Sequence, residues 1–259
     1  MSDTETGPIP TIRKPFVGLE IVIVLAICFG RSALYAIISL IEKLTRGEPL
    51  ADQTTTMNPS ITPDRPWLDL AYQLYYFVFP TATVMLALYL LYQAYGRARS
   101  LVGFNLAEPG RDSLRALAIC AAVGIPGLAF FFVARELGLN TNIVPANLAT
   151  TWWTIPILIG SAIVAGVSEE VIMLGYLFTR LRTLNWAPFW IVFTSAIIRG
   201  SYHFYQGFGG FVGNLVMGAA FGWLFLRWKR VLPFVIAHTV FDIVSFVGYA
   251  LLAPVISWL

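Results

Sequence analysis

The stretch SAIVAGVSEEVIMLGYL at residues 161–177 decides how the rest of the chain is interpreted. With its flanks it forms an apolar segment at 152–179, and a bilayer core of about 30 Å needs about 20 mainly apolar residues to be crossed. Yet the segment carries two adjacent acids, Glu169 and Glu170. A charge at the bilayer centre costs at least about 2.5–3.5 kcal/mol, so such groups indicate a function. The segment therefore predicts a buried polar site inside a membrane protein.

The composition of the whole chain supports this interpretation. Of its 259 residues, 58% are hydrophobic and only 12% are charged, whereas a soluble domain carries about 25% charged residues. This excludes a soluble globular enzyme and a disordered chain. The net charge of +3 is too small to attract nucleic acid. Cys28 and Cys120 lie in apolar stretches and form neither a disulfide framework nor a cysteine-rich zinc site.

Apolar stretches long enough to cross a bilayer recur along the chain, so we predict an all-α, polytopic membrane protein of seven transmembrane helices. They cover residues 16–41, 68–94, 115–134, 152–179, 187–205, 208–226 and 231–257. An eighth element arises if the long fourth stretch is broken, or if residues 99–108 lie in the membrane interface.

The chain is predicted to form one membrane domain. Residues 1–15 are a cytoplasmic tail, residues 16–150 hold the first spans and a polar loop at 42–66, and residues 151–259 form the motif-bearing core. Lysine and arginine gather in the loops on one side, which orients membrane proteins with that side in the cytoplasm. We therefore expect a protein integral to the plasma (inner) membrane, with the N-terminus inside and the C-terminus outside. The basic residues of the cytoplasmic side are Arg13, Lys14, Arg97, Arg99, Arg111, Arg115, Arg180, Arg182, Arg227, Lys229 and Arg230.

Further ionisable residues lie in the last four spans. Arg199 and His203 are four residues apart and share a helix face, as do His238 and Asp242. Adjacent residues differ by about 100° around a helix, so one of the two glutamates can face a cavity while the other braces a neighbouring helix. We predict one polar site shared by these helices.

Two kinds of hydrolysis fit such a site. Glu169, His203 and His238 form a ligand set that holds catalytic zinc or another divalent metal, which turns a bound water into a nucleophile. Alternatively, a buried glutamate and a histidine activate water directly, and the second histidine stabilises the oxyanion. The residue types leave both routes open, and neither needs an organic cofactor.

The order and spacing of three short motifs carry a resemblance to a known family. The motifs are EEVIML at 169–174, RGSYH at 199–203 and HTVFD at 238–242. Over residues 150–245 the chain resembles the CPBP family of intramembrane endopeptidases, which includes CAAX-processing and bacteriocin-processing or immunity (Abi-like) proteins. The family pattern is E-E-x-x-x-R, then F-x-x-x-H, then H-x-x-x-N or H-x-x-x-D.

The resemblance implies a role for each matching residue. Glu169 is the acid that activates the catalytic water, and His203 is its partner. His238 and Asp242 hold the oxyanion or a metal, and Glu170 is a supporting acid. The implied reaction is hydrolysis of a peptide bond in a membrane-associated peptide or protein.

Two positions depart from the family pattern. Leu174 stands where the family has arginine, and Arg199 stands where it has phenylalanine. A buried charge needs a partner. We therefore expect Arg199, from the adjacent helix, to supply Glu170 with the charge that Leu174 lacks.

Other interpretations stay open at this point. Loss of the motif arginine is also compatible with a non-catalytic membrane scaffold or immunity protein that binds peptides or partner proteins, and buried acids and histidines also serve proton-coupled transporters. Asn214 is a supporting candidate that hydrogen-bonds into the site or to a neighbouring helix. The glycine pairs Gly209/Gly213 and Gly218/Gly222 allow close helix packing, either within the chain or in a homodimer.

Overall fold

The computed structural model describes residues 14–253, and within them the chain consists mainly of helices. Six helical segments between residues 14 and 253 are long and apolar enough to cross a membrane, which confirms the predicted all-α polytopic class. They are Phe16–Thr45, Pro66–Tyr95, Pro109–Glu136, Thr154–Thr183, Phe208–Trp228 and Leu232–Leu252. The fifth predicted span contains a helix of only 14 residues, α8 (Pro188–Ser201). At 1.5 Å per residue α8 is about 21 Å long, shorter than a hydrocarbon core.

Three of the six segments contain a short π-helical turn. Residues Ala26–Gly30 join α1 (Lys14–Leu25) to α2 (Arg31–Thr45), and Cys120–Gly124 join α4 (Pro109–Ile119) to α5 (Ile125–Glu136). The third turn, Val171–Tyr176, joins α6 (Thr154–Glu170) to α7 (Leu177–Thr183). The long fourth stretch is thus one continuous helix that widens directly after Glu170. π-Helical turns are rare in proteins as a whole, but those that occur are often found at functional sites.

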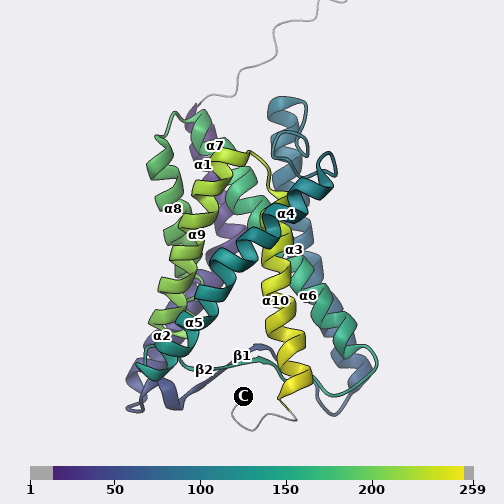
Figure 1. Cartoon of the computed structure of the whole chain (residues 1–259), viewed down its shortest axis with the longest axis vertical. Helices are drawn as coiled ribbons and strands as arrows, with labels where there is room; N and C mark the ends of the chain where they lie inside the picture. Colours follow the sequence, from purple (N-terminus) through teal and green to yellow (C-terminus); the bar gives the residue numbers. More distant parts are fainter. Residues whose placement is uncertain (1–13, 254–259) are drawn as a thin grey trace, which may run out of the picture.

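The remaining helices are α3 (Pro66–Tyr95), α9 (Phe208–Trp228) and α10 (Leu232–Leu252). In Figure 1, α8 and α9 form one side of the molecule, α10 and α6 form the other, and the α4–α5 segment crosses obliquely between them. The predicted tail at 1–15 and the end of the last predicted span, 254–257, lie almost wholly outside the described residues.

A small parallel sheet lies at the lower end of the helices (Figure 1). It pairs β1 (Thr54–Asn58) with β2 (Asn142–Ala146), with Thr54 opposite Asn142. Neither strand was predicted, because each is a five-residue segment that is stabilised only by a partner distant in sequence.

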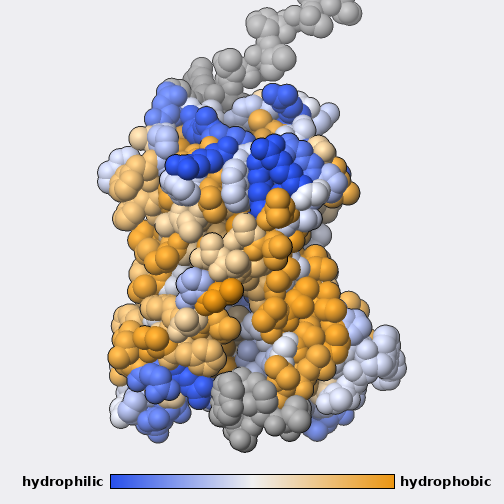
Figure 2. Space-filling view, viewed as in Figure 1, coloured by the Kyte–Doolittle hydropathy of each residue, from blue (hydrophilic) through white to orange (hydrophobic). Residues whose placement is uncertain are grey.

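Figure 2 shows a broad hydrophobic band around the middle of the visible face, with hydrophilic residues gathered at both ends. Large apolar side chains are exposed on several of the long helices, among them Ile23, Leu34, Met85 and Val216. A soluble protein rarely exposes so much contiguous apolar surface, so the surface agrees with a bilayer environment.

Glycines let the motif-bearing helices approach one another closely. A β-carbon on Gly166 in α6 would lie 2.6 Å from Thr239 Oγ1 and 3.1 Å from the Val235 carbonyl oxygen of α10. One on Gly218 in α9 would lie 3.1 Å from Arg199 Cδ of α8. Close packing within the chain, one of the two predicted uses of the glycine pairs, is therefore confirmed for Gly218. The homodimer stays a prediction.

Candidate active site

The structure brings the three sequence motifs to one place. Glu169 and Glu170 are the last residues of α6, His203 follows the end of α8, and His238 and Asp242 lie in α10. They meet because α8 is short and ends in the turn that holds His203, and because Gly166 lets α6 pack directly against α10.

Glu170 is the buried centre of the cluster. Its side chain is fully buried, and one carboxylate oxygen lies 2.6 Å from Nδ1 of His238. Arg199 Nη2 lies 2.8 Å from the same carboxylate. The predicted pairing of Arg199 with Glu170 is therefore confirmed, and Leu174 lies buried in the apolar core instead. The charge that the family motif carries in one helix comes here from the neighbouring helix.

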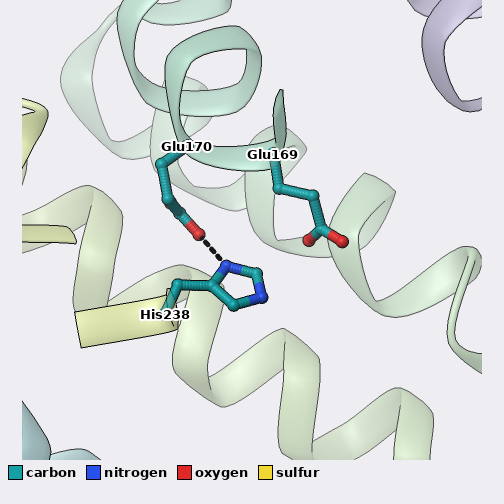
Figure 3. A group of neighbouring side chains, drawn as sticks. All are labelled: Glu169, Glu170 and His238. Carbon is teal, nitrogen blue, oxygen red and sulfur yellow. Dashed lines mark hydrogen bonds and ion pairs between the residues drawn. The ribbon is translucent and has the colours of Figure 1, made fainter. Parts of the chain in front are cut away.

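Glu169 points to a different part of the cluster. Figure 3 shows Glu169 and Glu170 approaching the ring of His238 from different sides. Glu169 Oε2 accepts a hydrogen bond of 2.7 Å from the Tyr202 hydroxyl and lies 3.4 Å from Arg199 Nη1. Its side chain is 16% exposed, whereas that of Glu170 is 0% exposed. The two acids thus divide as predicted, with Glu169 partly accessible and Glu170 braced between helices.

His203 is oriented by the backbone of its own turn. Its Nδ1 lies 2.9 Å from the carbonyl oxygen of Arg199. A carbonyl oxygen only accepts hydrogen bonds, so Nδ1 carries the proton and Nε2 has the free lone pair of a neutral imidazole. The ring packs 4.7 Å from that of Tyr202, and His203 lies close enough to Glu169 and His238 to interact electrostatically with both.

Asp242 lies on the accessible side of His238. Its Oδ2 is 3.6 Å from His238 Nε2, and its side chain is 17% exposed. The ring of His238 therefore has a carboxylate near each nitrogen, Glu170 at Nδ1 and Asp242 at Nε2. This arrangement stabilises a protonated ring and fixes its orientation.

The acids and His238 could also hold a metal. Among the described residues, Glu169, Glu170 and His238 offer ligand atoms within 4.8 Å of one another. The sequence analysis assigned His203 to the metal ligand set together with Glu169 and His238, whereas the structure puts Glu170 in that set in place of His203. This donor set fits a metal poorly, because both carboxylates already face the guanidinium of Arg199, at 3.4 and 2.8 Å. A permanent positive charge there repels a divalent cation and stabilises the acids without one.

Two site contacts were missed by the sequence analysis. The ring of Tyr202 stacks on that of Phe29, with centroids 4.9 Å apart, while its hydroxyl binds Glu169. Lys43, buried at the end of α2, donates to the Thr55 hydroxyl at 2.5 Å and to the carbonyl oxygen of Tyr205 at 2.7 Å. Lys43 therefore ties β1 to the turn that holds His203. Both contacts join segments far apart in sequence, so no local pattern indicates them.

Asn214, predicted to bond into the site or to a neighbouring helix, does neither in the described part of the chain. Its amide donates to the Gly210 carbonyl one turn earlier in α9, at 2.9 Å. A second ion pair lies elsewhere in the helices: Glu20 pairs with Arg180 and accepts a hydrogen bond of 2.7 Å from the Tyr176 hydroxyl. This partly buried pair joins α1 to α7.

Comparison with known proteins agrees with the geometry. Residues 151–244 match the family described as type II CAAX prenyl endopeptidase Rce1-like. The matched segment contains all three motifs, which confirms the resemblance drawn from the sequence. No curated protein and no solved structure matches the chain. The matched segment is 94 of the 259 residues, so the similarity covers the motif-bearing part of the chain.

Proposed function

We propose that the chain hydrolyses a peptide bond in a membrane-associated peptide or protein, because residues 151–244 match the family described as type II CAAX prenyl endopeptidase Rce1-like. The observation that carries this proposal is the cluster itself. Three short motifs from separate apolar helices converge on His238 and a partly accessible Glu169, and every buried charge among them has a partner. Such costly groups are kept in a membrane when they serve a function.

The proposed reaction begins with a water molecule held between Glu169 and His203. Glu169 is an acceptor stabilised as a carboxylate by Tyr202 and Arg199, and His203 offers the lone pair of Nε2. One of them takes a proton as the water oxygen attacks the carbonyl carbon of the substrate. A tetrahedral intermediate with a negative oxygen forms. The proton then passes to the amide nitrogen, the C–N bond breaks, and a carboxylate and an amine leave.

His238 is proposed to stabilise the negative oxygen. Glu170 and Asp242 flank its two nitrogens, so the protonated ring is favoured and Nε2 carries a hydrogen. A positioned donor that faces the developing charge lowers the barrier without reorganisation. Glu170 and Arg199 act as positioning residues, because Arg199 holds Glu170 and Glu170 holds the ring of His238. We propose a metal-free mechanism, since Arg199 already supplies the positive charge beside both acids.

The test compares new protein termini in membranes that contain the wild type or Glu169→Gln at equal abundance. Glu169→Gln keeps the shape of the side chain and removes the proton acceptor. Glu136→Gln is the matched control, because Glu136 is exposed at the end of α5, far along the chain from the motifs.

We expect termini that are present with the wild type and Glu136→Gln and absent with Glu169→Gln. These termini also name the substrate. If no terminus depends on Glu169 while the variant keeps its fold, the protease proposal is wrong, and a non-catalytic scaffold that binds peptides becomes the better explanation.

A further inference from the structure

A groove on the outer face of α3 has no part in the site described above. It has a volume of about 800 Å³. Its long wall is formed by Met85, Leu88, Tyr89 and Tyr92, which lie at i, i+3, i+4 and i+7 and so make one stripe along the helix. Three of these side chains, Met85, Tyr89 and Tyr92, are more than half exposed. In a bilayer this wall faces lipid chains.

One end of the groove is basic. Helix α3 ends at Tyr95, and Gly96 with φ +67° reverses the chain there, so that Arg97 and Arg99 line the same groove. Both arginines are exposed, and neither side chain makes a hydrogen bond, ion pair or ring contact with any residue between 14 and 253.

Neighbouring arginines behave differently. Arg230 binds the carboxylate of Asp112 at 2.5–3.1 Å, and Arg115 lies 5.0 Å from the ring centre of Trp228. Arg97 and Arg99 therefore have no acidic partner among residues 14–253, whereas Arg230 is paired with Asp112. Their guanidinium groups are planar double donors that match a phosphate geometrically.

We propose that this groove binds one anionic phospholipid, of the phosphatidylglycerol type, with its phosphate on Arg97 and Arg99 and an acyl chain along α3. The two unpaired positive charges complement a headgroup with a net negative charge. The apolar wall of the groove complements an acyl chain. The phenols of Tyr89 and Tyr92 suit the depth of the lipid ester groups, because tyrosine favours the membrane–water interface. A basic pocket beside a membrane helix is a recurrent way to hold an anionic headgroup.

The test measures lipid binding to the purified full-length protein by native mass spectrometry, with phosphatidylglycerol and phosphatidylcholine of the same chains. We expect phosphatidylglycerol to bind more tightly than phosphatidylcholine. In the double variant Arg97→Gln/Arg99→Gln the affinity for phosphatidylglycerol should fall by about tenfold to thirtyfold, since each basic side chain near the membrane surface adds a similar factor to the affinity for anionic lipid. The matched control is Arg182→Gln/Lys229→Gln, which removes two positive charges from the cytoplasmic side in the predicted topology, outside the groove.

Two further measurements distinguish binding of the acyl chain in the groove from binding of a phosphate group alone. Met85→Trp narrows the groove at an exposed position and is expected to weaken the lipid without altering the fold. Inorganic phosphate in large excess should not displace the lipid.

The proposal is overturned by any of four results: equal binding of both lipids, full binding in the arginine double variant, an equal loss in the control, or no effect of Met85→Trp. Displacement by phosphate alone would likewise reject a lipid in favour of a free anion. None of these results depends on whether the chain cleaves peptides.

Discussion

Replacing Arg199 by methionine removes the charge that braces both acids while keeping most of the side-chain volume. The guanidinium lies 2.8 Å from Glu170 and 3.4 Å from Glu169, and its side chain is 1% exposed. Removing one partner of a buried ion pair costs about 3–5 kcal/mol, because the other charge is left uncompensated. We therefore expect Arg199→Met to lower the free energy of unfolding by about that amount.

The cause is separated from general damage by a double-mutant cycle with Glu170→Gln. In the double variant Arg199→Met/Glu170→Gln, no uncompensated charge remains at position 170, so the combined loss should be smaller than the sum of the single losses by about 2–3 kcal/mol. The glutamine oxygen still accepts from His238, which keeps that ring in place.

The assay is a reversible denaturant titration of the protein in mixed micelles, followed by the fluorescence of its 8 tryptophans. Arg182→Met is the control, because Arg182 is an exposed arginine of α7; its effect should stay within about 0.5 kcal/mol. Losses that add within about 0.5 kcal/mol in the cycle would refute the idea that Arg199 replaces the motif arginine.

The remaining predictions concern helix packing, a site hydroxyl and metal dependence. Gly166→Ala places a methyl group 3.1 Å from the Val235 carbonyl and should cost about 1–3 kcal/mol by the same titration, whereas Gly127→Ala, with open space around it, should not destabilise. Tyr202→Phe keeps the ring on Phe29 and removes the 2.7 Å bond to Glu169, so cleavage should slow by about tenfold or more and the free energy of unfolding should fall by about 1–3 kcal/mol. A tight chelator should leave the Glu169-dependent termini intact in isolated membranes; their loss, restored by added zinc, would contradict the metal-free mechanism.

The sequence by itself determined the class of the protein and the ionisable residues of the candidate site. Apolar stretches of about 20 residues commit a chain to membrane helices, because no other backbone satisfies its hydrogen bonds in lipid. Glu169, Glu170, His203 and His238 could be found in the sequence because ionisable groups are costly there. The pairing of Arg199 with Glu170 also followed, since a buried charge requires a partner.

Tertiary structure decided what depends on contacts between distant segments. The shortness of α8, the strand pair β1–β2 and the clamp of Lys43 on the turn of His203 all rest on partners far away in the sequence. The assignment of Glu170 rather than His203 to the group around His238 depends on ångström-scale distances between three helices. A local pattern fixes which face a residue occupies. Only packing fixes which side chains meet across that face, because it depends on where glycines such as Gly166 let backbones touch.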